Sequence, residues 1–281
     1  MKIISHKREM QQMAKQLLSS GKTIGFVPTM GYLHEGHLTL AREAKRNNDI
    51  VVMSIFVNPL QFGPGEDYEA YPRDQKRDEL LAEAAGVDLL FIPSVADMYD
   101  AEMSTKMTVV KRNNALCGND RPGHFDGVVT VLAKLFHIVM PDKAYFGLKD
   151  AQQFAIVSGM VADYDFPVQL VPLETVRDSS GLAISSRNVY LSDREKEQAP
   201  SIYKSLLLAK NKIENGATNI GEIKSVVTDY LKCHTDATVD YVDILCYPEL
   251  APLEKVQGRV IIALAVKFSK ARLIDNIILD V

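Results

Sequence analysis

Residues 23–57 have the sequence TIGFVPTMGYLHEGHLTLAREAKRNNDIVVMSIFV, and this stretch sets the fold. Two runs rich in β-branched and aromatic residues, 23–27 and 50–57, flank a segment from 36 to 47 whose apolar side chains recur at helical spacing. The order strand, helix, strand predicts a crossover unit, because two parallel strands need a connection of about a dozen residues or more, usually a helix. We therefore expect the two strands to pair in parallel.

The same alternation continues outward from this stretch. Helices are expected at 73–85, 127–139 and 151–162, and strands at 88–92, 144–146 and 168–171. Such alternation predicts an α/β fold with a doubly wound parallel sheet covered by helices on both faces. Ligands of such sheets bind at the carboxyl ends of the strands, so the loops after Val27, Val57 and Phe146 are the candidate site.

The pattern changes after about residue 175. Two helical stretches near 200–215 and 220–233 precede strand-like runs at 238–245, 259–268 and 271–279. Helices followed by successive strands predict a smaller C-terminal α+β domain. We expect domains at 1–175 and 176–281, although the polar segment 177–188 fits either one.

The composition excludes several classes of protein. A formal net charge of -4 does not suit a surface that neutralises nucleic acid, which needs a basic face. Three widely spaced cysteines without a Cys-x-x-Cys pair indicate neither a disulfide framework nor a zinc site. The longest aliphatic run, 260–266, is far shorter than the roughly 20 residues that span a bilayer, and the first residues lack the apolar core of a signal peptide. We expect a cytoplasmic protein with neither a membrane nor a nucleic-acid partner.

The first candidate constellation is the segment 28–37, between the first strand and its helix. His34 and His37 are three residues apart, so in a helical first turn they share one face. The amide groups and the dipole of a helix start favour an anion such as phosphate, and imidazolium groups there would offset charge on a leaving pyrophosphate.

Two histidines near a helix start also fit a plain capping or surface role. A zinc site of the metalloprotease type is a weaker match, because its histidines are four apart. No P-loop sequence occurs, and no Gly-x-Gly-x-x-Gly follows the first strand, so a P-loop kinase or a dinucleotide enzyme is not indicated.

A second constellation, FVNPLQFG at 56–63, follows the next strand. Asn58 and Gln61 are neutral amides among apolar residues, which is typical of a pocket for a small substrate with hydroxyl groups and an apolar body. A solvated Pro-Gly turn is the simpler interpretation of the same residues.

The third and fourth constellations supply cations and hydroxyls. In YFGLKDAQQ at 145–153, Lys149 suits a phosphate and Asp150 could accept from ribose hydroxyls, or could simply cap the next helix. In the segment 176–188, Ser185 and Ser186 next to Arg187 could clamp phosphate oxygens in a mobile loop, or could belong to a solvated linker.

Taken together and in this order, the segments resemble the pantothenate synthetase family, over essentially the whole chain. The narrowest matches are FVNPLQF at 56–62, RPGHFDG at 121–127 and FGLKDAQQ at 146–153. This family is similar to α/β nucleotidyl-transfer proteins with a Rossmann-like domain, whose His-x-x-His and Ser-rich elements bind ATP. Leu148 and Ala151 stand where many relatives carry Glu and Tyr, which puts only local helix packing in doubt.

The resemblance implies a role for each matched position. His37 would be the proton donor, assisted in catalysis by His34, Lys149 and Arg187. Gln61 and Gln153 would hold pantoate, with Asn58 from the amide pocket beside them, and Gln61 would also lie near β-alanine. The implied ATP-binding residues are Met30, Gly31, Tyr32, Leu33, His34, Glu35, Gly36, His37, Gly147, Leu148, Lys149, Asp150, Val176, Ile184, Ser185, Ser186 and Arg187.

The implied activity is an AMP-forming ligation of pantoate to β-alanine through a pantoyl adenylate, with ATP as substrate and Mg²⁺ as cofactor, in a homodimer. No residues are assigned to the metal. The alternatives are a nucleotidyltransferase acting on a phosphate ester, a truncated tRNA synthetase and a binding module. A tRNA synthetase would need a basic RNA-binding domain, which a pI near 5.9 does not indicate.

Overall fold

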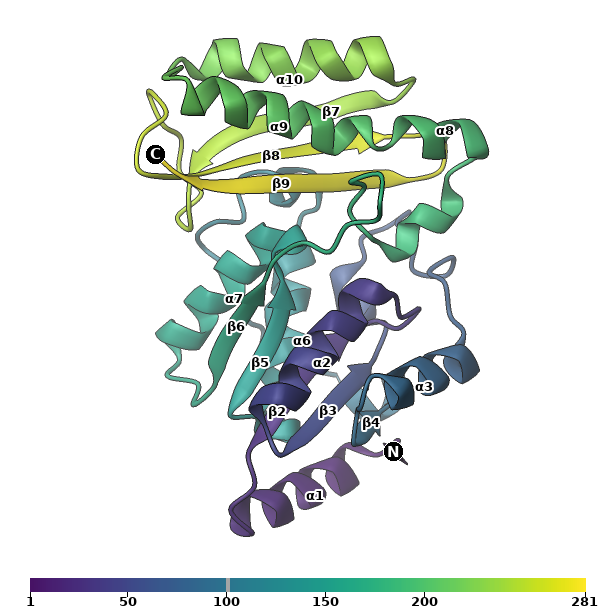
Figure 1. Ribbon diagram of the computed structural model, residues 1–281. Coiled ribbons are helices and arrows are strands. Elements are labelled where there is room, and N and C mark those ends of the chain that lie inside the picture. Colours follow the sequence, from purple (N-terminus) through teal and green to yellow (C-terminus); the bar gives the residue numbers. More distant parts are fainter. Residues whose placement is uncertain (100–101) are drawn as a thin grey trace. The chain divides into compact units, whose positions relative to one another are not determined.

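Figure 1 shows the computed structural model, which describes residues 1–99 and 102–281. The chain divides into two compact units. The first comprises Met1–Val110, Arg121–Leu148 and Ile156–Glu174, and the second comprises Lys111–Asp120, Lys149–Ala155 and Thr175–Val281. The functional division into an ATP- and pantoate-binding domain and a closing domain stays a prediction.

The secondary structure follows the expected alternation closely. In chain order the helices and strands are β1 (Lys2–Ile4), α1 (Lys7–Ser19), β2 (Ile24–Thr29), α2 (Glu35–Asn47), β3 (Ile50–Ile55), η1 (Pro59–Gln61), α3 (Gln75–Ala84), β4 (Leu89–Phe91), α4 (Val95–Met98), α5 (Cys117–Asp120), α6 (His124–Val139), β5 (Lys143–Gly147), η2 (Leu148–Asp150), α7 (Ala151–Asp163), β6 (Gln169–Leu173), η3 (Ser186–Tyr190), α8 (Asp193–Gln198), α9 (Ser201–Glu214), α10 (Ile220–His234), β7 (Thr238–Cys246), β8 (Arg259–Lys267) and β9 (Arg272–Asp280). Each η element is a short 3₁₀ helix.

The first unit is built on a six-stranded sheet in the order β1-β4-β3-β2-β5-β6. Every neighbouring pair is parallel, so the predicted doubly wound α/β sheet is confirmed. From β2 the chain proceeds outward through β3 and β4, and from β5 it proceeds in the opposite direction to β6. The topological switch point therefore lies between β2 and β5, and in open parallel sheets ligands bind outside the carboxyl ends of the strands at this point.

Helices cover both faces of this sheet (Figure 1). On one face α2 packs against β2, β3 and β5 and also contacts α3, while on the other α1 and α6 pack against β2 and each other. The two central strands are accordingly mostly apolar: apart from Thr29 and Ser54, β2 and β3 place consecutive apolar residues in the core rather than alternating them with polar ones. This is the pattern of parallel strands that are buried on both faces.

The second unit holds the predicted α+β element. Its sheet is antiparallel in the order β7-β8-β9, and α9 and α10 pack together over one face (Figure 1). The central strand β8 buries every residue from 260 to 266, which explains the uninterrupted aliphatic run in the sequence. The opposite face packs against Leu116, Ala151 and Ala155 from the two earlier segments of this unit.

The N-terminal elements were not expected from the sequence. The strand β1 has three residues and pairs in parallel with β4, at an edge of the large sheet. The helix α1 buries Met10 and Ala14 against the remainder of the unit. No helix within residues 1–99 and 102–281 is long and apolar enough to cross a membrane.

Candidate active site

The loop after β2 is shaped by its glycine. Gly31 has φ of 84°, and an added Cβ would lie 2.8 Å from Ile55 Cγ2, so only glycine fits without a shift. The next two amides then point the same way: Tyr32 N and Leu33 N both donate to the Asp78 carboxylate, at 2.7 Å each. The loop is thus fixed by a single side chain on α3.

Asp78 is 2% exposed, and its environment has opposing effects on the pKa of its carboxyl. Burial raises the pKa of this carboxyl above its usual range, while the two backbone N–H groups and Arg77, 3.6 Å away, act to lower the pKa. The ionised carboxylate offers each of the two amide donors an oxygen acceptor. Asp78 was not predicted from the sequence, because nothing local to α3 indicates a partner 45 residues earlier.

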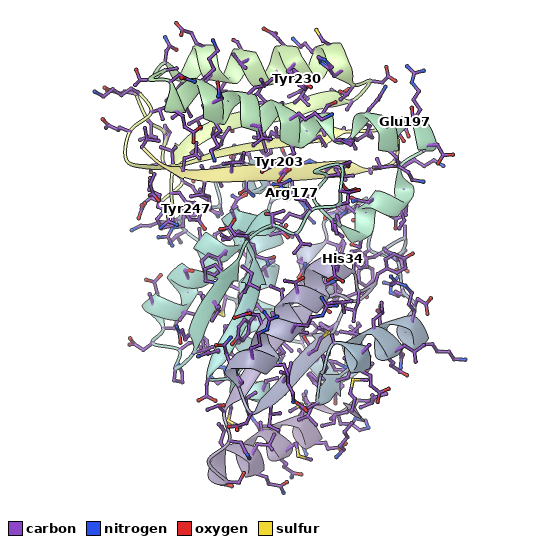
Figure 2. The ribbon with its side chains drawn as sticks, viewed as in Figure 1. His34, Arg177, Glu197, Tyr203, Tyr230 and Tyr247 are labelled. Carbon is purple, nitrogen blue, oxygen red and sulfur yellow. The ribbon has the colours of Figure 1, made fainter. Side chains whose placement is uncertain are left out.

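His34 and His37 lie at the start of α2, directly after this loop. Figure 2 labels His34. Their rings stack with centroids 3.9 Å apart and planes inclined by 22°, as the spacing of three predicted. Gly36 allows this arrangement, since a Cβ there would come within 2.9 Å of the His34 ring. The exposed Glu35 instead forms an ion pair with Arg42 further along the helix.

Asn58 is 1% exposed, and its side-chain amide forms hydrogen bonds within the protein. Its Nδ2 donates to Gln61 Oε1 at 3.2 Å and to the carbonyl of Gly127 at 3.1 Å. Its Oδ1 accepts from Leu60 N and from the hydroxyl of Tyr99, and burial raises the pKa of Tyr99, which keeps that hydroxyl protonated. Asn58 therefore fixes the orientation of Gln61.

Gln61 connects Asn58 with the loop after β2. Its Nε2 donates to Met30 Sδ at 3.2 Å, and its Oε1 accepts from Asn58. A thioether sulfur is a weak acceptor. The Gln61 amide can therefore exchange this contact for a better oxygen acceptor on a ligand.

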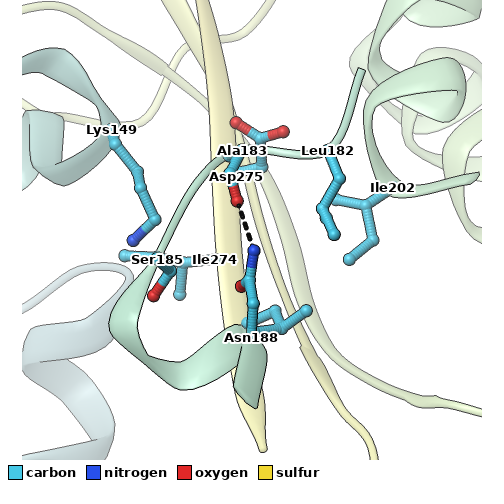
Figure 3. A pocket seen from close by; sticks show the side chains of 9 residues that line it. Lys149, Leu182, Ala183, Ser185, Asn188, Ile202, Ile274 and Asp275 are labelled. Carbon is cyan, nitrogen blue, oxygen red and sulfur yellow. Dashed lines mark hydrogen bonds between the residues drawn. The ribbon is translucent and has the colours of Figure 1, made fainter. Parts of the chain in front are cut away.

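The second unit contains a small pocket of mixed character, shown in Figure 3. Lys149, Ser185, Asn188 and Asp275 contribute its polar groups. Asn188 Nδ2 donates to the carbonyl of Ala183 at 3.1 Å, drawn as the dashed line. Leu182, Ala183, Ile202, Leu273 and Ile274 form the rest of the wall. A cation beside hydroxyl and amide groups in an apolar hollow suits a phosphate ester.

A buried ion pair fixes the hairpin that leads into this pocket. Arg177 donates to both carboxylate oxygens of Asp275 on β9, at 2.6 and 2.9 Å, and to the carbonyl of Gly181. The guanidinium also lies 3.5 Å from the centroid of the Tyr203 ring, and Figure 2 shows the two side chains together. Arg177 and Ala183 form a β-bridge, so the hairpin is pinned at its base.

Asn276, next to Asp275 on β9, is bonded to the segment that contains Lys149. Asn276 Nδ2 donates to the backbone carbonyl of Lys149 at 2.9 Å. Because consecutive strand residues point to opposite faces, β9 positions the Arg177 hairpin on one face and the Lys149 segment on the other. Both cationic segments of the second unit therefore depend on this strand.

The sequence profile of the pantoate–beta-alanine ligase family matches residues 2–278. The chain belongs to this family. It is 61% identical to a pantothenate synthetase of Bacillus cytotoxicus over 281 residues, covering all of both chains. A pantothenate synthetase from Thermus thermophilus superposes with a TM-score of 0.93 at 44% identity, covering 99% of each chain. A pantoate–beta-alanine ligase from Francisella tularensis, solved with beta-gamma ATP and beta-alanine, superposes with a TM-score of 0.82 at 34% identity, covering 99% of this chain and 97% of that one.

Membership of the pantoate–beta-alanine ligase family makes this chain an ATP-dependent ligase. The predicted site residues fall in both compact units. The first unit carries the segment from Met30 to His37 with Asn58, Gln61, Gly147 and Leu148; the second carries Lys149, Asp150, Gln153, Val176, Ile184, Ser185, Ser186 and Arg187. In the second unit Ser185 accepts from the amide of Arg187 at the start of η3.

Proposed function

We propose that this ligase condenses pantoate with β-alanine in two steps through a pantoyl adenylate. The pantoate carboxylate attacks the α-phosphorus of ATP, and pyrophosphate leaves. The amine of β-alanine then attacks the acyl carbon, loses a proton and displaces AMP. The contact of Gln61 with Met30 carries this proposal, because it joins a substrate-type amide to the loop that leads into the two histidines.

His34 and His37 would act on the phosphates. The first step needs no base, since its nucleophile is already an anion, but it builds charge on the leaving pyrophosphate. Hydrogen-bond donors aimed at that charge lower the barrier. The stacked imidazoles at the N-terminus of α2 support this role for the pair, with His37 as the proton donor.

Gln61 would orient pantoate, and would also lie near β-alanine, as the resemblance implies. A hydroxyl oxygen is a better acceptor than the Met30 sulfur, so a hydroxy acid gains a hydrogen bond at little cost to the protein. Gln153 of the second unit is the proposed second pantoate residue. Asn58 takes part by holding the Gln61 amide.

The cations of the second unit would complete the ATP site. Lys149 and Arg187 would neutralise phosphate charge, while Asp150 would accept from ribose and Val176 would meet adenine through its backbone. The other ATP contacts are assigned to Gly147, Leu148, Ile184, Ser185 and Ser186. The grouping of Lys149 with Ser185 in one pocket supports this assignment.

Mg²⁺ would enter with the nucleotide. Within residues 1–99 and 102–281 there is no group of three His, Cys, Asp or Glu side chains that could hold a metal ion. Magnesium commonly binds through substrate phosphates and water with few protein ligands, so MgATP would not need such a group. When bound, the ion would offset charge on the phosphates. We further propose a cytoplasmic homodimer, as the resemblance implies.

Isotope exchange tests the two-step mechanism. Labelled pyrophosphate should exchange into ATP with only pantoate and Mg²⁺ present, because adenylate formation is reversible and needs no amine. Adding β-alanine should then yield AMP and pantothenate in equal amounts. Formation of ADP, or exchange that requires β-alanine, would rule out the adenylate. Transfer of the nucleotide to a phosphate ester, without amide formation, would favour the alternative nucleotidyltransferase.

The role of His37 is tested by replacement. His37→Ala should lower kcat for adenylation by about 100-fold or more, the usual cost of losing one donor to transition-state charge. The matched control is His234→Ala, since His234 is exposed, its Nδ1 lies 2.8 Å from the Tyr230 carbonyl, and its ring stacks on that of Tyr230 in the same helix. A His37→Ala enzyme with the kcat of the control would remove His37 from the mechanism.

A further inference from the structure

The motif RPGHFDG at 121–127 lies where α6 begins, and no function has been assigned to it above. Two of its side chains converge on one backbone atom: the carbonyl oxygen of Gln61. Arg121 Nη2 donates to it at 3.2 Å, and His124 Nδ1 lies 2.7 Å from it. Both contacts join residues about 60 positions apart in the chain and lie within the first unit.

The hydrogen-bond pattern fixes the tautomer of His124. Arg121 Nη1 lies 3.1 Å from His124 Nε2, and a guanidinium can only donate, so Nε2 is the acceptor. A carbonyl oxygen can only accept, so Nδ1 carries the proton that it donates to Gln61. In this arrangement His124 directs its Nδ1–H at the Gln61 carbonyl.

Gly127 lets the helix approach the Gln61 turn. An added Cβ at this position would lie 2.2 Å from the Leu60 carbonyl oxygen and 2.7 Å from Gln61 N. The Gly127 carbonyl, in turn, accepts from Asn58 at the other end of the turn. The helix and the η1 turn are thus in direct backbone contact, and any larger residue would push them apart.

Arg121 is itself held in place. Its Nε donates to Glu66 Oε1 at 2.9 Å, and its Nη2 forms an ion pair with the other oxygen of this carboxylate. This pairing lowers the pKa of Glu66, so the carboxylate stays ionised. The planar fork of an arginine can serve Glu66, His124 and the Gln61 carbonyl at once, which a lysine cannot.

We infer that Arg121, His124 and Gly127 form a cradle that sets the position of Gln61 and thereby the affinity for the hydroxy-acid substrate. They act through Gln61 and are positioning residues rather than catalytic ones. This inference rests on the proposed role of Gln61 in binding pantoate. Its expected signature is a change in the pantoate KM with little change in the ATP KM, because both bonds act on the substrate-binding turn.

The test compares steady-state kinetics of His124→Ala, His124→Asn and Arg121→Lys with the wild-type enzyme. His124→Ala should raise the pantoate KM about 10-fold, the effect of one lost hydrogen bond, and leave the ATP KM within about twofold. His124→Asn should recover most of the pantoate affinity, because its side-chain N–H can occupy the position of Nδ1. Arg121→Lys should resemble His124→Ala.

The matched control is His137→Ala, at the other end of the same helix. His137 Nδ1 bonds to the carbonyl of Ala133 in its own helix, and the side chain is exposed, so both KM values should stay at their wild-type levels. Urea unfolding of each variant checks that the fold is retained. If His124→Ala does not fold, Arg121→Lys decides the question by the same two KM values.

Gln61→Ala separates this inference from the proposed function. If Gln61→Ala raises the pantoate KM while the cradle variants leave it unchanged, the cradle is wrong and the proposed site stands. If Gln61→Ala has wild-type kinetics, the proposed role of Gln61 fails, and the cradle fails with it. Equal rises in the pantoate and ATP KM values for His124→Ala, without recovery in His124→Asn, would show a general structural role and overturn the inference.

Discussion

The two units hold the segments that carry the proposed site residues by different electrostatic means. In the first unit the Asp78 carboxylate accepts from the amides of Tyr32 and Leu33, so that backbone dipoles do more to balance the buried charge than the exposed Arg77, 3.6 Å away. In the second unit the Asp275 carboxylate meets the full charge of Arg177. The first arrangement needs one particular side chain, because every loop carries N–H groups, whereas the second needs two.

This difference determines which buried groups lose their partner when a residue is replaced. Loss of Asp78 leaves two amides without an acceptor but no charge in the core. Loss of Arg177 leaves a carboxylate whose side chain is 1% exposed without its counter-ion. An unpaired buried charge costs more than an unpaired buried dipole. We therefore expect the second unit to be the more sensitive to single substitutions.

Arg177→Ala should have the largest effect on stability. Breaking a buried ion pair from one side costs about 3–5 kcal/mol, and here the stacking on Tyr203 is lost as well. The control is Arg259→Ala, since Arg259 on β8 pairs with the exposed Asp280 on the neighbouring strand β9 and should cost less than about 1 kcal/mol. Urea unfolding measures both. Equal costs for the two variants would contradict the comparison.

Asp78→Asn should have a smaller effect, about 2 kcal/mol. The Asn oxygen can accept from one amide, but its N–H groups then face the other, which leaves one buried donor unsatisfied. Asp74→Asn is the control on the same helix: Asp74 caps α3, and Asn caps a helix equally well. The free energy of unfolding should be near wild type in the control. A cost for Asp78→Asn above that for Arg177→Ala would reverse the order of the two units.

The substitution Glu195→Gln should have the smallest effect of the three, and it should change the pH dependence of stability. Its carboxylate accepts from the amides of Ser269 and Ser192, and these bonds lower its pKa to about 2 from 4.5. Because the pKa of Glu195 is lowered on folding, its carboxylate contributes stability that is present above pH 4.5 and is lost as the pH falls towards 2. Glu195→Gln should remove this part of the pH dependence, measured by urea unfolding between pH 5 and about 2. Curves of equal slope for both proteins would show that the hydrogen bonds do not favour the ionised form.

Much of the fold was predictable because its signals are local. Most of the strands and helices from residue 23 onward follow from apolar periodicity, although the short helices α4, α5 and α8 were not predicted. The stacking of His34 on His37 follows from helical spacing. The edge strand β1 was missed, because three residues form a strand only when a partner such as β4 is already in place. The helix α1 shares this N-terminal segment and was missed with it.

The supporting residues of the site were not predictable in the same way. Asp78 lies in an ordinary helical sequence, and only the close approach of Tyr32 and Leu33 distinguishes it from a surface aspartate. His124 and Arg121 belong to a motif that the resemblance identified, but their common partner is a backbone carbonyl. A backbone carbonyl exists at every position and leaves no trace in the sequence.

By itself the sequence determined the order of strands and helices, the parallel sheet and the chemistry available at the ends of its strands. These properties depend on neighbours within a few residues, through periodicity, helix starts and turn residues. Only the tertiary structure decided which side chains hold the site: Asp78, Asp275 and the pair Arg121 and His124 each bond to partners 45 to 98 residues away. Such contacts form when packing removes polar groups from water, and the identity of the partner then depends on the whole fold.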